Sequence, residues 1–140
     1  MYELTYCSSA TSSLGAEDIS GILEKARDFN SKNNITGCLL YHNHEFIQIL
    51  EGEKETVLNL FTKIGQDHRH TNIVLLAEGN KKDRVFYNWS MAYHELSKDD
   101  AQGIGEGVFV DNFITFSSLA EKSTFPALLF WNTAQRMLKK

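Results

Sequence analysis

One short segment limits what this chain can fold into: residues 46–52, with the sequence Phe-Ile-Gln-Ile-Leu-Glu-Gly. Successive side chains of a strand point to opposite faces of its sheet. Both faces of this segment are apolar apart from one amide: Phe46, Gln48 and Leu50 share one face, and Ile47 and Ile49 share the other. We therefore expect a strand that is buried on both sides. A buried amide without partners costs about 1–3 kcal/mol, so a polar group must lie beside Gln48, either an ordinary core partner or a bound polar ring.

The overall composition excludes several classes of protein. The 140 residues suit one domain, and 42% of them are hydrophobic, which is enough for a sizeable core. The net charge is −4, and no basic run is longer than Lys81-Lys82, so we expect neither a nucleic-acid partner nor a membrane surface. The first residues lack a cationic, apolar leader, and no apolar run is long enough to span a membrane. We expect a cytoplasmic protein in which Cys7 and Cys38 stay reduced.

Hydrophobic periodicity predicts an α+β fold. Strand-like and helix-like segments alternate in the order β-α-β-β-α-β-β, which is typical of a ferredoxin-like unit with two helices on one face of a mixed five-stranded sheet. The expected strands are residues 2–9, 35–41, 46–52, 72–79 and 85–93, and the expected helices begin at Glu17 and Glu53. In this fold the first and third strands are neighbours. We expect residues 1–95 to form this domain.

The remaining segment, residues 96–140, is expected to be a helical extension. Ser97 to Asp100 resembles a helix start, and Pro126 suits the first turn of a final helix. Because the central strands are apolar on both faces, the sheet needs a cover on the side away from the helix pair. We expect the final helix to pack on that face or in the interface of a homo-oligomer.

Motifs for metal binding and covalent catalysis are weak or missing in the sequence. His42-x-His44 and His68-x-His70 have no cysteine or carboxylate at zinc-like spacing, so no metal site is predicted. No nucleophile motif is present, and the first loop, residues 8–15, has no basic residue to hold a phosphate. We expect no enzymatic activity, although a small ferredoxin-like hydrolase and a ligand-free structural module stay open as alternatives.

Three polar side chains are predicted to converge inside the core. Tyr6 and Gln48 belong to neighbouring strands, and Asn30 ends the apolar stripe of the first helix. One such residue would be an ordinary core group, whereas three favour a ligand with a polar rim and a flat apolar body. Ile22 and Ile64 are the inward residues of the two helices, placed to contact such a body. His68, Arg69 and His70 either bind a phosphate tail or cap the second helix, and the segment favours neither.

Several of these residues match one known family. The matching blocks are Tyr6-Cys7-Ser8, Asn30, residues 35–41, residues 46–52, residues 67–70 and Arg84-x-Phe86-x-x-Trp89-Ser90-Met91. With these blocks and their spacing, residues 1–93 resemble the BLUF domain, a blue-light sensor that uses FAD. The chain departs from common family patterns at Ala26, where many members carry a serine, and at Phe29.

The resemblance implies a role for each matched position. It places the flavin ring between Ile22 and Ile64, with Asn30 and Gln48 on its polar edge. Asp67, Arg69 and His70 would lie near the ribityl and phosphate part. Tyr6 would donate an electron and a proton to the excited flavin, and Gln48 would keep a changed hydrogen-bond pattern that Trp89 and Met91 sense. The implied protein is a photoreceptor with non-covalently bound FAD, a homo-oligomer that signals to an unidentified effector protein.

Overall fold

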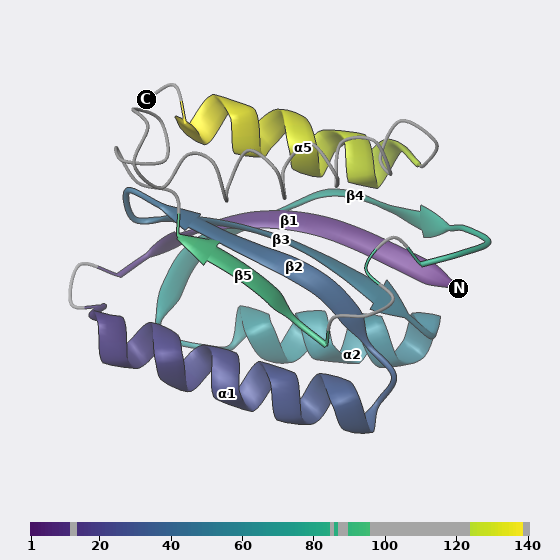
Figure 1. The fold of residues 1–140 in the computed structure, drawn as a ribbon, viewed down its shortest axis with the longest axis horizontal. Helices are drawn as coiled ribbons and strands as arrows, with labels where there is room; N and C mark the ends of the chain where they lie inside the picture. Colours follow the sequence, from purple (N-terminus) through teal and green to yellow (C-terminus); the bar gives the residue numbers. More distant parts are fainter. Residues whose placement is uncertain (12–13, 85, 87–89, 96–123, 139–140) are drawn as a thin grey trace.

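The computed structural model describes residues 1–11, 14–84, 86, 90–95 and 124–138. Its elements confirm the α+β class and lie in three layers, with two helices below a central sheet and a third helix above it (Figure 1). The strands are β1 (Tyr2–Ala10), β2 (Thr36–His42), β3 (Glu45–Gly52), β4 (His70–Asn80) and β5 (Ala92–Glu95). The helices are α1 (Ala16–Lys32), α2 (Lys54–Gly65) and α5 (Phe125–Leu138).

The sheet has the order β4-β1-β3-β2-β5. Its first four strands pair antiparallel, and the short β5 pairs parallel with β2 at one edge. The predicted adjacency of the first and third strands is confirmed, because Tyr6 lies directly opposite Gln48. The β2–β3 hairpin turns through Asn43 and His44, both at positive φ, a geometry that suits the twist of a two-residue hairpin turn.

The two faces of β3 separate as its sequence predicts. Phe46 and Leu50 belong to the core between the sheet and the α1–α2 pair, whereas Ile47 and Ile49 belong to the core between the sheet and α5. All four side chains are at most 4% exposed. A glycine is required beside this strand at Gly37, because a Cβ atom there would lie 2.0 Å from the carbonyl oxygen of Ile49.

The final helix covers the sheet face opposite the helix pair, which was one of the two expected positions (Figure 1). Pro126 lies in its first turn, where a missing backbone N–H costs little. The Pro126 carbonyl oxygen accepts a 2.8 Å hydrogen bond from the Thr5 hydroxyl of β1. Phe130 and Ala134 of α5 are fully buried against the sheet. The predicted helix start at Ser97 to Asp100 lies outside the described residues.

The predicted fifth strand over residues 85–93 is wrong in its bounds. β5 begins only at Ala92, and the described residues just before it, Phe86, Ser90 and Met91, belong to no strand. Three of their backbone groups bond to side chains. The Phe86 N–H donates to the Glu51 carboxylate, and the carbonyl oxygens of Ser90 and Met91 accept from Asn30 and Arg27. Alternating hydrophobicity cannot reveal such partners.

Candidate functional site

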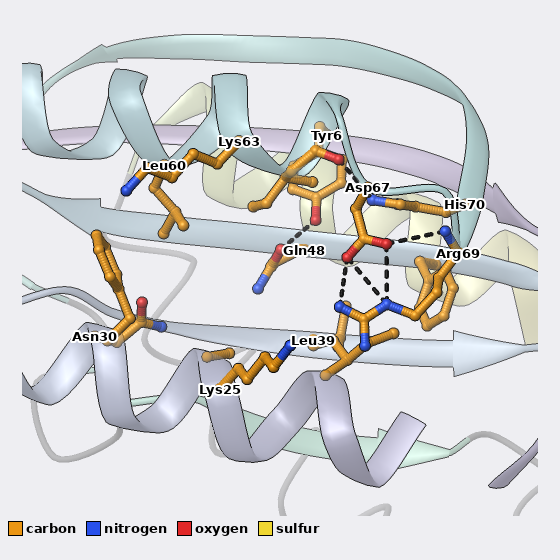
Figure 2. Close-up of a pocket in the computed structure, with 15 residues that line it drawn as sticks. Tyr6, Lys25, Asn30, Leu39, Gln48, Leu60, Lys63, Asp67, Arg69 and His70 are labelled. Atoms are coloured by element: carbon orange, nitrogen blue, oxygen red, sulfur yellow. Dashed lines mark hydrogen bonds and ion pairs between the residues drawn. The ribbon is translucent and has the colours of Figure 1, made fainter. Parts of the chain in front are cut away.

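A cavity of about 280 Å³ opens between the helix pair and the sheet. Figure 2 shows the side chains that converge on it. Those named in advance are Tyr6, Ile22, Asn30, Gln48, Ile64, Asp67, Arg69 and His70. The sequence-based prediction did not name Lys25, Leu39, Phe46, Leu60 or Lys63 as lining residues. Lys25 lies three residues after Ile22 and therefore on the same face of the helix. That spacing could have predicted that Lys25 lines the cavity.

Tyr6 and Gln48 form the polar floor of the cavity, and β1 and β3 position them by direct pairing. The Tyr6 hydroxyl group donates a hydrogen bond to Gln48 Oε1 (Figure 2). Gln48 Nε2 donates to Met91 Sδ at 3.2 Å. All three residues are at most 5% exposed. The structure therefore links Tyr6, Gln48 and Met91 in one buried chain of hydrogen bonds, and a thioether is a weak acceptor for its last step.

Burial also fixes the charge of Tyr6. Removal from water raises the pKa of the Tyr6 phenol well above its ordinary value, and the negative charge of Asp67 raises it further. The phenol therefore stays protonated at any ordinary pH. Its ring lies 5.3 Å from the ring of Phe61, centroid to centroid, within the core beneath the helices.

Asn30 has an unused acceptor in this core. Its Nδ2 donates a 2.8 Å hydrogen bond to the Ser90 carbonyl oxygen, but its buried Oδ1 has no hydrogen-bond partner among the described residues. The side chain lines the cavity and is 1% exposed. An unpaired buried acceptor costs about 1–3 kcal/mol, so a donor that reaches Oδ1 would stabilise the protein.

At the other end of the cavity, Asp67 and Arg69 form an ion pair. Arg69 Nη2 lies 2.6 Å from Asp67 Oδ2, and Arg69 Nε lies 2.9 Å from Oδ1. The hydrogen bond from the Arg69 side chain lowers the pKa of Asp67 to about 2 and raises the pKa of Arg69. The charge of Arg69 is thus largely matched inside the protein.

His70 serves the end of the second helix. Its Nε2 lies 2.9 Å from the Ile64 carbonyl oxygen, and because a carbonyl only accepts, Nε2 carries the hydrogen. Nδ1 lies 2.9 Å from the Ser8 hydroxyl oxygen. The capping interpretation is therefore confirmed for His70, while the side chain still lines the cavity. His68 is exposed and is not among the lining residues.

Two lysines border the cavity from opposite helices. Lys25 belongs to α1 and Lys63 to α2 (Figure 2). Lys63 Nζ also lies 4.9 Å from the centre of the Phe29 ring, within range of a cation–π contact. No group of three metal-ligating side chains occurs among the described residues. Trp89, which was predicted to sense the site, lies outside them.

These features are those of a small-molecule-binding domain with an apolar cleft and a few convergent polar groups. A family model described as "Sensors of blue-light using FAD" matches residues 1–92. The chain therefore belongs to the BLUF family, whose domains bind flavin. The resemblance noted in the sequence is confirmed, and the hydrolase alternative is not supported.

Related proteins include a long chain, of which the matched region is a small part, and short chains that are matched almost in full. The photoactivated adenylate cyclase β subunit of Euglena longa is 42% identical over 83 residues, which are 59% of this chain and 10% of that protein. The chain thus spans about a tenth of the length of this curated relative. The photo-activated state of BlsA is 31% identical with a TM-score of 0.70, and the match covers 99% of this chain and 95% of BlsA. The dark state of BlrB is 28% identical with a TM-score of 0.68, covering 86% and 96% of the two chains.

Among the described residues, the helices are too short or too polar to cross a membrane.

Proposed function

We propose that this chain is a blue-light receptor that binds FAD non-covalently and signals without catalysing a reaction. The observation that carries the proposal is the buried Tyr6–Gln48–Met91 chain beside a cavity with an unpaired Asn30 oxygen. An ordinary core would leave neither the cavity nor the unpaired acceptor, because folded interiors are closely packed and buried polar groups are bonded.

The residues that line the cavity suit a flavin. Asn30 Oδ1 would accept from an N–H group on the polar edge of the ring, and the Gln48 amide would contact the same edge. Ile22 and Ile64 line the cavity from the two helices and would contact the apolar part of the ring. Ala26 lacks the hydroxyl group that many members carry, so one hydrogen bond near the ring would be missing here.

The phosphate part would meet positive side chains at the mouth of the cavity. The charge of Arg69 is already neutralised by Asp67. Lys25 and Lys63 are therefore the lining cations that are more available to bind an anion. Their flexible stems let both ammonium groups follow an anion. Asp67, Arg69 and His70 would then shape the ribityl end of the site, with Asp67 and Arg69 held by their own ion pair.

A bound flavin supplies a chromophore that absorbs blue light and becomes an oxidant when excited. Tyr6 is a redox-active side chain on the cavity floor, and loss of an electron would make its hydroxyl proton strongly acidic. That proton lies on a hydrogen bond to Gln48 Oε1. Gln48 therefore receives or relays the proton that Tyr6 releases, and Tyr6 regains both proton and electron when the charges recombine.

The Gln48 amide is suited to act as the switch. In one orientation Oε1 accepts from Tyr6 and Nε2 donates to Met91 Sδ. If the amide is reversed, Nε2 donates to the Tyr6 hydroxyl oxygen, which is also an acceptor. Because the Met91 sulfur is a weak acceptor, losing its hydrogen bond in the reversed orientation would cost little free energy. Met91 and the neighbouring Trp89 would pass the change to the rest of the chain.

The signal would leave by contact with another protein. We infer a cytoplasmic homo-oligomer in which residues 1–95 form the sensor and residues 96–140 form a helical extension that packs on the sheet or in the oligomer interface, which is a second route for the signal. The match to photoactivated cyclase subunits supports an effector partner, because in those proteins the matched region is a small part of a longer chain.

An absorption spectrum tests the proposal directly. The purified protein should be yellow, and blue light should shift its flavin bands slightly and reversibly to longer wavelength. Flavin released by heat and separated by chromatography should be FAD rather than FMN. A colourless preparation that takes up no added flavin would contradict the proposal, and release of FMN alone would contradict the choice of FAD.

A further inference from the structure

The connection between β4 and β5 consists of residues 81–91. It leaves β4 at one edge and enters β5 at the opposite edge. Its side chains contact the intervening strands in spatial order. Lys81 Nζ lies 3.1 Å from Glu3 Oε1 on β1 and also binds Glu51 on β3. Arg84 Nη1 then donates to the Thr36 hydroxyl oxygen at the start of β2, at 2.8 Å.

Glu51 is the centre of these contacts. Its Oε1 accepts 2.9 Å hydrogen bonds from the Thr36 hydroxyl group and from the Phe86 backbone N–H. Its Oε2 accepts from Lys81. Glu51 is fully buried, and so is Glu3 beside it. A buried carboxylate with several donors holds its partners firmly, because losing any of them leaves charge uncompensated.

The far end of the same connection lies in the flavin site. The Ser90 carbonyl oxygen accepts from Asn30, the Met91 carbonyl oxygen accepts from Arg27 at 3.1 Å, and Met91 Sδ accepts from Gln48. Phe86, Ser90 and Met91 are in no strand, so these side-chain contacts set their position. The connection is therefore held near Glu51 and again near Gln48.

Both anchors belong to β3. Gln48 and Glu51 are three residues apart, a separation of about 10 Å along a strand. They point to opposite faces, because Gln48 lines the cavity and Glu51 binds Phe86, whose ring packs on Phe130 of α5. Phe86 and Met91 are only five positions apart in the sequence, so a short covalent path joins the two anchors.

We propose that Glu51 is a positioning residue for the photochemical switch. By holding the Phe86 N–H it fixes the position of Phe86, and so keeps Met91 Sδ, five positions further along the chain, in reach of Gln48 Nε2. The proposal rests on the proposed function for its spectroscopic consequence, but not for the link between Glu51 and Met91. A merely stabilising Glu51 would change the melting temperature and leave Met91 in place.

The matched variants are Glu51→Gln and Glu3→Gln. Both remove one buried charge beside Lys81, but only Glu51 contacts Thr36 and Phe86. Methionine methyl labelling reports on Met91 directly, because the chain has only three methionines and Met137 of the α5 core is an internal control. We expect the Met91 methyl signal to move or broaden in Glu51→Gln and to stay unchanged in Glu3→Gln.

The flavin-bound protein gives the second measurement. Glu51→Gln should retain flavin and change the rate of dark recovery by about fivefold, within the range for residues coupled through one network. In a Met91→Ala background, the same substitution should have no further effect on recovery. Unchanged Met91 signal and recovery, equal effects of both charge variants, or an undiminished effect without Met91 would each overturn the proposal.

If Glu51→Gln does not fold, Thr36→Val removes one donor to Glu51 and is held to the same outcomes. If the wild-type protein binds no flavin, the proposed function fails. The methyl spectra of the flavin-free protein still decide whether Glu51 positions Met91.

Discussion

The buried polar groups on the two faces of the central sheet differ in how completely they are hydrogen-bonded. On the face toward α1 and α2, Gln48 has a thioether as acceptor and Asn30 has an unpaired oxygen, both beside a cavity. On the face toward α5, Glu51 is fully bonded and the core contains closely packed aromatic rings. The same strand thus carries a loosely bonded amide on one face and a firmly bonded carboxylate on the other. We propose that the first arrangement switches and that the second holds the backbone around it in position.

The largest difference between the faces should come from Tyr6→Phe. The variant keeps the ring and its packing, so it should retain flavin, but without a phenolic proton it should lose the light-induced shift completely. Absorption spectra before and after blue light measure this. Tyr2→Phe is the control, because Tyr2 is a buried tyrosine on the same strand face but bonds to Glu78, away from the cavity. A normal photocycle in Tyr6→Phe would refute its role as donor.

Gln48→Leu tests whether the switch needs an amide. Leucine has a similar size but no hydrogen-bonding group, so flavin should still bind while the normal red shift is lost. The measurement is the light-minus-dark difference spectrum. If the variant kept the full wild-type shift, Gln48 would be only a packing residue and the contrast between the faces would lose its functional meaning.

Truncating a buried side chain should lower the unfolding free energy more on the α5 face than on the face toward α1 and α2. Phe130→Ala empties a fully buried site on the α5 face and should cost about 3–5 kcal/mol of unfolding free energy. Ile64→Ala borders the cavity and should cost less than about 2 kcal/mol in the flavin-free protein. Urea unfolding measures both. Equal losses would mean that the cavity face is as closely packed as the other face.

The smallest effect concerns Asp67. Its ordinary pKa of 3.8 falls to about 2 in the folded protein, chiefly through the hydrogen bond from Arg69. A lowered carboxyl pKa adds stability that is fully present above about pH 4 and is lost as the pH falls through about 2. Asp67→Asn should remove this dependence, with a loss below about 1 kcal/mol near neutral pH because the pair is partly exposed. Thermal unfolding between pH 2 and pH 7 measures it, and parallel curves for both proteins would argue against the ion pair.

Much of the frame was predictable from local patterns. Period-two alternation in residues 46–52 gave the strand, its two buried faces and the need for a partner beside Gln48. The hairpin followed from two strand-like runs joined by a short polar turn. The convergence of Tyr6, Asn30 and Gln48 required one further step, the adjacency of the first and third strands in this fold, and the pairing of Tyr6 with Gln48 confirms it.

The segment before β5 was mispredicted for a physical reason. Residues 85–93 alternate as a strand does, but the Phe86 N–H and the Ser90 carbonyl oxygen bond to side chains that are distant in sequence. Nothing in the segment itself identifies Glu51 or Asn30 as those partners. The positions of Lys25 and Lys63 on either side of one cavity likewise depend on how two helices pack together.

The sequence by itself determined the α+β class, the strand that carries Gln48, the family and the set of polar residues that converge, because period, turn chemistry and residue type are local properties. Only the tertiary structure decided which acceptor is left unpaired, that His70 caps α2, and that the β4–β5 connection is held at two positions of β3. Those are relations between groups far apart in the chain, and hydrogen-bond partners over such distances exist only once the chain has folded.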